Sequence, residues 1–204
     1  MKKLCGYLFV ALATLAATGC IDNDIPYPIV KLDILTLSAE GEKAPATINT
    51  SACTVDFELE EIIDIRKVEI KDVTFTEGAE VDVEFPGRFD MRNALYVNLT
   101  KYQTFEWTIR ATQNIERYFR VEGQIGESEI DAVSHIATAY VPMDYDMNNV
   151  RITAAKFGPK DITTYYPDPL SFTSFDGTVH HTMVSYHGDI EEMWTLKIIQ
   201  KDID

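Results

Sequence analysis

Hydrophobic and polar residues alternate one by one over several short stretches of the chain. Val81, Val83 and Phe85 are separated by the acidic residues Asp82 and Glu84. The same pattern gathers large apolar residues on one face in three later stretches: Leu95, Val97 and Leu99; Phe105, Trp107, Ile109 and Ala111; Trp194, Leu196 and Ile198. A period of two is typical of half-buried antiparallel strands, whose successive side chains point to opposite faces. The pattern therefore predicts an all-β protein.

A second regularity is an internal duplication. Several motifs recur, in identical or similar form, at an offset of 82 residues: Glu40-Gly41 and Glu122-Gly123, Ile48-Asn49 and Ile130-Asp131, residues 64–70 and 146–152, Phe75 and Phe157. Trp107 recurs as Trp194 at an offset of 87, so the second copy holds about five extra residues before its last strand. A fixed offset over separated motifs indicates two copies of one unit of about 85 residues. Short strands and frequent turns in a unit of this size predict an Ig-like sandwich.

One stretch of the first copy also fits a helix, because Leu59, Ile62 and Ile63 are spaced like one helical face. The equivalent stretch of the second copy contains Pro142, and proline in a helix interior removes a hydrogen bond and clashes with the preceding turn. We therefore predict a strand end followed by a turn in both copies.

The N-terminus has the order of a lipoprotein signal. Met1 and two lysines precede an apolar run, 4–17, which is shorter than the roughly 20 residues that span a bilayer. The run ends in Ala17, Thr18, Gly19 and Cys20, which resembles a bacterial lipobox with Ala17 where leucine is commonest. Lipid attachment at Cys20, including an amide-linked palmitate-type chain, would give stable anchoring. The alternative is an ordinary secreted protein in which a cysteine follows Gly19 by chance.

Two acidic residues, Asp22 and Asp24, closely follow Cys20. This resembles the surface-export signal of Bacteroidetes lipoproteins and favours the outer surface of the outer membrane, with a plain acidic tether as the alternative. The predicted organisation is a signal peptide (1–19), a lipid anchor and tether (20–28), and two tandem Ig-like antiparallel β-sandwich domains (29–113 and 114–204).

Composition excludes several classes of protein. Acidic residues outnumber basic ones 33 to 18, for a formal net charge of −15. Nucleic acids and anionic lipid surfaces need a dense basic face, so neither is an expected partner. The three cysteines exclude a disulfide scaffold, because Cys5 leaves with the signal peptide and Cys20 carries lipid. Cys53 then has no partner in its own chain and is predicted to be a small buried or strand-end residue.

Three segments resemble one known family. They are residues 20–28 (CIDNDIPYP), 102–109 (YQTFEWTI) and 115–126 (IERYFRVEGQIG). They are similar to Bacteroidetes lipoproteins that carry a PCMD domain, which is named for carbohydrate metabolism. The resemblance covers only the N-terminal Ig-like region of that family, and we expect the chain to lack the larger C-terminal β domain. It therefore implies a glycan-related setting and no catalytic residue.

The histidines are candidates for a metal site. His180, His181 and His187 lie within eight residues and precede three acids, Asp189, Glu191 and Glu192. On one strand, however, His181 and His187 would lie about 20 Å apart and His180 would point to the other face. We therefore predict no metal, no cofactor and no catalytic residue. The carboxylates are expected to be solvated strand faces, since no glycosidase pair can be singled out among them.

Aromatic residues are the remaining candidates for binding. Tyr165 and Tyr166 precede Pro167, and on a stiffened loop their rings would stack on sugars; packing against the sandwich edge is the alternative. Trp107 and Trp194 occupy equivalent positions, which predicts core residues rather than sugar platforms.

The expected function is that of a surface-anchored, non-enzymatic lipoprotein, a spacer or interaction module in glycan acquisition. Its partners would be the membrane, through the lipid on Cys20, and glycans or other surface lipoproteins. Direct carbohydrate binding by loops of the second domain is the alternative, and metal-dependent hydrolysis ranks last.

Overall fold

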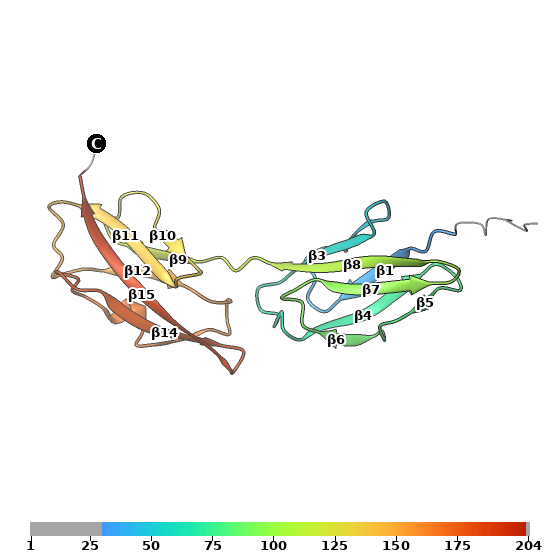
Figure 1. The fold of residues 1–204 in the computed structure, drawn as a ribbon. Helices are drawn as coiled ribbons and strands as arrows, with labels where there is room; N and C mark the ends of the chain where they lie inside the picture. Colours follow the sequence, from blue (N-terminus) through green and yellow to red (C-terminus); the bar gives the residue numbers. More distant parts are fainter. Residues whose placement is uncertain (1–29, 203–204) are drawn as a thin grey trace, which may run out of the picture. The chain divides into compact units, whose positions relative to one another are not determined.

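The computed structural model describes residues 30–202, which form an all-β protein (Figure 1). The described residues contain no α-helix, and their one helical turn is a 3-10 turn, η1 (Pro169–Ser171). The strands fall into two groups, β1–β8 and β9–β15, and each group forms a β-sandwich. The predicted all-β fold with two β-sandwiches is thus confirmed. The signal peptide, Cys20 and the tether lie outside the described residues.

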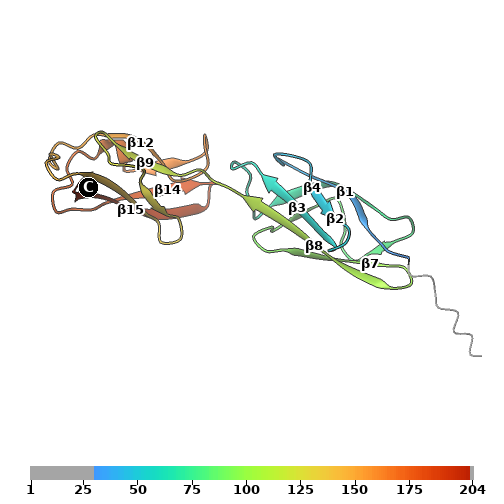
Figure 2. The same ribbon diagram turned by 90° about the horizontal axis from the view of Figure 1, so that it is seen from above.

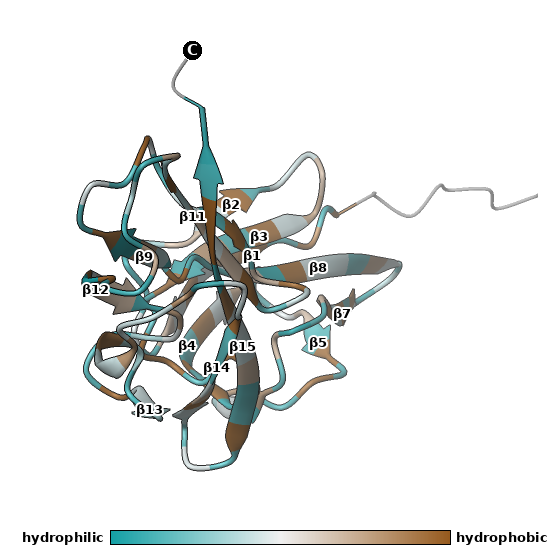
Figure 3. Ribbon diagram, turned by 90° about the vertical axis from the view of Figure 1, so that its left-hand side faces the viewer, coloured by the Kyte–Doolittle hydropathy of each residue, from teal (hydrophilic) through white to brown (hydrophobic). Residues whose placement is uncertain are grey.

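The first sandwich contains eight strands. They are β1 (Ile34–Ala39), β2 (Thr47–Asn49), β3 (Thr54–Leu59), β4 (Val68–Phe75), β5 (Glu80–Val81), β6 (Gly87–Phe89), β7 (Leu95–Thr100) and β8 (Thr104–Gln113). One sheet has the order β1-β4-β6 and the other the order β2-β3-β8-β7-β5. Hydrophobic residues alternate with polar ones along β8, and Figure 3 shows this banding.

The second sandwich contains seven strands. They are β9 (Tyr118–Val121), β10 (Glu129–Asp131), β11 (Ile136–Pro142), β12 (Ile152–Lys156), β13 (Thr164–Tyr166), β14 (His180–Tyr186) and β15 (Ile190–Lys201). Its five-stranded sheet has the order β10-β11-β15-β14-β13, and β9 pairs with β12 in a two-stranded sheet. Figure 2 shows β9 and β12 in one layer and β14 and β15 in the other.

The strand directions differ in one respect from the antiparallel expectation. β3 pairs with β8 in parallel, and β11 pairs with β15 in parallel. All other pairings among the described strands are antiparallel. Hydrophobic alternation along a strand does not indicate the direction in which the strand pairs. The chain crosses to the other sheet between the two strands of each parallel pair, so no hairpin requires them to be antiparallel.

Each sandwich has a hydrophobic core of its own. The core of the first includes Trp107, and that of the second includes Trp194; both side chains are fully buried, at 0% exposure. The indole N–H of Trp107 donates to the carbonyl oxygen of Leu32 at 3.0 Å. The indole of Trp194 stacks on Phe157 at 4.7 Å between ring centroids. The prediction that both tryptophans are core residues is confirmed.

The duplication extends to individual turns. Asn49 Oδ1 accepts N–H bonds from the second and third residues after it, and Asp131 Oδ1, 82 residues further on, does the same. Both turns end in a residue with positive φ, Cys53 at 52° and His135 at 54°. Cys53 directly precedes β3, which agrees with the prediction of a strand-end residue.

A second repeated feature is a glutamine side chain that hydrogen-bonds the turn after β3 in the first copy and the turn after β11 in the second. The side-chain amides of two glutamines, 87 residues apart, donate to backbone carbonyl oxygens of these turns: Gln113 to Glu60, Glu61 and Ile63, and Gln200 to Met143 and Tyr145. The stretches after β3 and after β11 are both turns, so the helix alternative is wrong.

The extra residues of the second copy can be located by equivalent hydrogen bonds. Met91 N–H donates to Ile65 O in the first sandwich, and Phe175 N–H donates to Met147 O in the second. The two acceptor residues are 82 positions apart, whereas the two donor residues are 84 positions apart. Two of the extra residues therefore lie between β12 and Phe175, and the remaining ones lie between Phe175 and Trp194 on the last strand. This stretch contains η1 and, among the described residues, forms no strand equivalent to β6.

Residues 30–202 contain no helix of the length and apolarity needed to cross a membrane.

Candidate functional site

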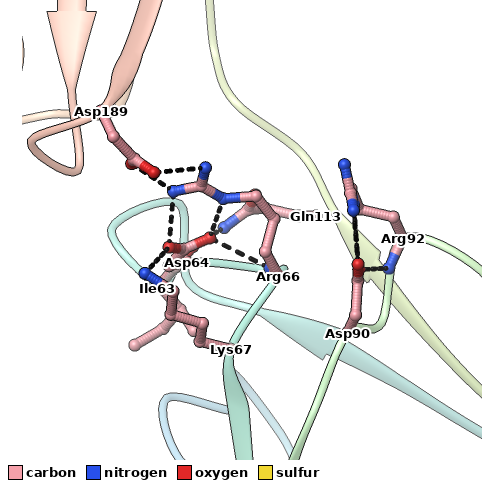
Figure 4. Close-up of polar contacts among 8 residues, drawn as sticks. All are labelled: Ile63, Asp64, Arg66, Lys67, Asp90, Arg92, Gln113 and Asp189. Atoms are coloured by element: carbon pink, nitrogen blue, oxygen red, sulfur yellow. Dashed lines mark hydrogen bonds and ion pairs between the residues drawn. The ribbon is translucent and has the colours of Figure 1, made fainter.

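A charged cluster is centred on Arg66, on the turn between β3 and β4 (Figure 4). Arg66 donates to both carboxylate oxygens of Asp64, each at 2.8 Å, and its own backbone N–H also reaches Asp64. The same guanidinium donates to Asp189, on the β14–β15 turn, at 2.6 and 3.0 Å. The contact between Arg66 and Asp189 thus joins residues 123 positions apart, within the compact unit Leu32–Asp204.

The cluster strongly favours the ionised carboxylates. The hydrogen bond from Arg66 lowers the pKa of Asp64 to about 2, although burial opposes this. The same guanidinium lowers the pKa of Asp189 and has its own pKa raised by the two carboxylates. Bidentate arginine–carboxylate pairs have a defined geometry as well as charge attraction, so the cluster positions these residues.

A second ion pair lies on the same turn. Lys156 Nζ donates to both carboxylate oxygens of Glu61, at 2.7 and 2.9 Å, and the Lys160 N–H adds a bond of 3.1 Å. The two side chains are only 11% and 20% exposed. Burial by itself would raise the pKa of Glu61, but the bonds from Lys156 and Lys160 outweigh it and lower the pKa. Both ion pairs connect a turn of the first sandwich with segments of the second.

Arg66 is expected to make the stability of the protein depend on acidity. The pKa of Asp64 is lower in the folded chain than its ordinary value of 3.8, so its stabilising effect is complete above about pH 4 and is lost as the pH falls through about 2. In Arg66→Gln the denaturation midpoint should be lower at neutral pH and should fall less between pH 4 and pH 2. Urea titrations across this range measure both effects.

Arg92→Gln is the matched control for this prediction. Arg92 pairs with Asp90 in the same chemical way, but both side chains are largely exposed, at 61% and 42%. Solvent screens such a pair, so the control should change the pH dependence less. Equal effects in the two variants would contradict the role assigned to Arg66.

Sequence reasoning did not single out Arg66 or Glu61 as interacting residues. Asp64 recurs as Asp146, whereas Arg66 and Glu61 are replaced by Asn148 and Met143 in the second copy. Most other positions of residues 61–70 also differ between the copies, so the comparison of the copies does not mark these two residues. Their partners in the second sandwich could not be read from the chain.

The candidate histidine cluster of the sequence does not converge on one point. His180 lies between Phe172 and Phe175, with centroid distances of 4.2 and 4.5 Å, and its Nε2 contacts the Ser174 carbonyl oxygen. His181 points to the other face of β14, where its Nδ1 lies 3.2 Å from Thr195 Oγ1. Within residues 30–202, no group of three or more histidine, cysteine or acidic side chains is placed to hold a metal ion.

The acidic residues that follow the histidines in the sequence belong to different hydrogen-bond networks. Glu192 accepts the O–H of Tyr186 at 2.6 Å and the indole N–H of Trp194 at 3.0 Å, and His135 Nε2 lies 3.8 Å away. Burial, followed by the bond to Glu192, raises the pKa of Tyr186. Glu192 is thus the acceptor of a network at the edge of the second core, whereas Asp189 belongs to the Arg66 cluster.

Tyr165 and Tyr166 face opposite sides of their sheet. The Tyr165 oxygen accepts the Phe157 N–H at 3.1 Å, and its ring meets the Phe157 ring edge-on at 6.1 Å. Tyr166 is 83% exposed. The two tyrosines therefore do not form one platform, and Tyr166 is the one whose ring is available to a ligand.

The second sandwich contains at least two cavities. The larger, of about 530 Å³, follows β9 and is lined mainly by polar groups, including Tyr118, Arg120 and Glu127. The smaller, of about 400 Å³, lies beside β13 and includes Tyr165 and Leu170 in its lining. Neither cavity contains the histidine cluster.

Comparisons with known proteins leave the family open. No family model matches the chain, and no curated protein gives a significant match. One similar solved structure is described as "a putative glycoside hydrolase from bacteroides thetaiotaomicron", with a TM-score of 0.39 and 16% identity over 52% of this chain and 33% of that one. The chain thus spans about a third of that protein, and a similarity of this degree carries no argument about activity. The family resemblance of the sequence stays a prediction.

Proposed function

We propose that this protein is a lipid-anchored, non-enzymatic module that spaces or presents binding partners at the bacterial outer surface. The observation that carries the proposal is what the two copies have in common. The repeated residues are buried tryptophans, turn-forming Asn49 and Asp131, and the glutamines that hold the turns, and all of these stabilise the fold. A duplicated framework without a duplicated polar site is typical of a building block.

The residues that looked chemically promising also support this proposal, because they have structural contacts. His180 packs between two phenylalanine rings, Glu192 accepts bonds from core aromatics, and Tyr165 belongs to the core edge. The ion pairs of Arg66 and Glu61 connect the two sandwiches, which suits a spacer that holds its partner away from the membrane. The glycan-related setting rests on the family resemblance of residues 20–28, 102–109 and 115–126.

The anchor provides the experiment. In Cys20→Ser the thiol that accepts the lipid is gone, so we expect loss of incorporated radiolabelled palmitate and release of the protein from the membrane fraction. The wild-type protein in intact cells should be degraded by added protease if it faces outward. A Cys53→Ser variant is the control and should remain in the membrane. Retention of the Cys20→Ser protein in membranes would show that another segment holds it.

A second candidate function is direct carbohydrate binding by the second sandwich. The exposed ring of Tyr166 favours it, since an aromatic face in solvent is a suitable surface for a sugar ring. Metal-dependent hydrolysis ranks below both, and metal analysis of the purified protein tests it.

A further inference from the structure

An uncharged apolar row crosses the outer face of the five-stranded sheet in the second sandwich. Tyr166 on β13 is paired with Met183 on β14, and Met183 is paired with Met193 on β15. Their neighbours Thr182, Val184 and Trp194 are buried, so successive side chains alternate and the three row residues point outward. Tyr166 is 83% exposed and Met193 is 51% exposed, with Met183 half-buried between them.

The first sandwich has a different surface at the same place. Trp107 pairs with Val97 and Trp194 with Thr182, which fixes the equivalent positions. Beside Trp107 the row consists of Glu106 and Asn98, and Asn98 donates two hydrogen bonds to Asp82. A solvated polar row is therefore compatible with this fold. Tyrosine and methionine at these positions of the second copy are not a requirement of the sandwich.

Hydrogen-bonding side chains flank the row on both sides. Thr164 is paired with Ser185 on one side, and His181 with Thr195 on the other. The flanks carry hydroxyl and imidazole groups and also the carboxylate of Glu191, which is paired with Ser185. The row spans about 10 Å across three strands, because neighbouring strands lie roughly 4.8 Å apart. An apolar strip of this width between rows of hydrogen-bonding groups matches a chain of pyranose rings, which has apolar faces and hydroxyl edges.

We propose that the Tyr166–Met183–Met193 row binds a neutral polysaccharide. The charge of the chain argues for a neutral ligand, since a protein with a net charge of −15 repels acidic glycans and the row offers no cation to compensate. The size of the row argues against a protein partner, because a stable protein interface covers about 800 Å² on each side. Methionine side chains adapt to an irregular surface, and the tyrosine ring provides a flat one.

The proposal rests on the glycan-related setting of the proposed function and is tested independently of the anchor. The full-length lipoprotein, purified in a neutral detergent, is run on native gels that contain a soluble β-glucan, α-glucan, mannan or xylan, or the acidic polygalacturonate. At least one neutral polysaccharide should retard it, and polygalacturonate should not. Tyr166→Ala should weaken the retardation by about tenfold, the effect of losing one stacked ring.

The double variant Met183→Asn/Met193→Glu is designed to keep the fold, because it installs the residues that the first sandwich has at these positions. It should weaken binding as Tyr166→Ala does. Tyr96→Ala removes a 59% exposed tyrosine from the outer face of the first sandwich and should have no effect. Circular dichroism verifies that all variants are folded.

Four results would overturn the proposal. They are no retardation by any neutral polysaccharide, equal retardation by polygalacturonate, equal loss in Tyr96→Ala, and self-association in sedimentation velocity that the row variants abolish. The last result would make the row an interface between copies of the chain. Failure here leaves membrane anchoring through Cys20 unaffected, so it can be distinguished from failure of the proposed function.

Discussion

Trp107→Ala should split the thermal unfolding of the protein into an early and a late transition. Trp107 is fully buried in the first core, and replacing a buried tryptophan by alanine costs about 3–5 kcal/mol. A small domain has a stability of only about 5–15 kcal/mol, so the first sandwich should unfold early. The second sandwich has a separate core and should unfold late. Trp194→Ala should give the reverse order.

Each variant keeps one of the two tryptophans of the chain, and the fluorescence of that residue reports on the unsubstituted sandwich. In Trp107→Ala the remaining fluorescence comes from Trp194 and should change only in the late transition, while far-UV circular dichroism follows both. Tyr96→Ala serves as the exposed aromatic control and should unfold as the wild type does. A single transition at the wild-type midpoint would contradict the burial of the substituted tryptophan. A single transition at a lower midpoint would mean that the two sandwiches unfold together.

Gly41→Ala should destabilise the first sandwich by about 2–5 kcal/mol, the sum of backbone strain and overpacking. Gly41 has a φ of 67°, which is unfavourable for residues with a Cβ. A Cβ there would also lie 2.3 Å from Ile63 Cγ1, on the turn that Gln113 holds. Urea denaturation measures the loss.

Substitutions at two further glycines distinguish the contribution of backbone strain from that of overpacking. Gly177 has a φ of 63° and open space around its Cβ position, so Gly177→Ala should show backbone strain alone, about 1–2 kcal/mol. Gly123 is the equivalent of Gly41, and a Cβ there would meet Tyr145 at the milder distance of 3.2 Å. The expected order of destabilisation is Gly41, then Gly123, then Gly177. A loss at Gly41 no larger than that at Gly177 would show that Ile63 moves aside freely.

The sequence predicted the features that depend on local pattern. Alternation identified the buried face of β8, and the duplication placed Trp107 and Trp194 in equivalent core positions. The 82-residue offset paired Asn49 with Asp131, and these residues form equivalent turns in the structure. These features repeat because each is determined by residues close together in the chain, or by the side on which a strand is buried.

Features that depend on distant residues were not predictable. Arg66 meets Asp189 across 123 positions, and no local pattern indicates that contact. The parallel pairing of β3 with β8 is equally invisible, because alternation gives the face of a strand and not its direction. Tyr165 and Tyr166 are neighbours in sequence, but adjacent strand residues point to opposite faces, and only Tyr166 is on the outer one.

The position of the last strand in each sandwich has a consequence for how the protein is made. β8 is the central strand of its five-stranded sheet and β15 is the central strand of the other, although each is the final strand of its group. A chain that emerges from the ribosome or the secretion channel N-terminus first cannot complete either large sheet until this strand has appeared. Until then β3 and β7, or β11 and β14, expose the edges that β8 or β15 will join, and such edges invite aggregation. The first sandwich is complete at Gln113, before β9 begins, so it can close while the second still needs protection by a holding chaperone.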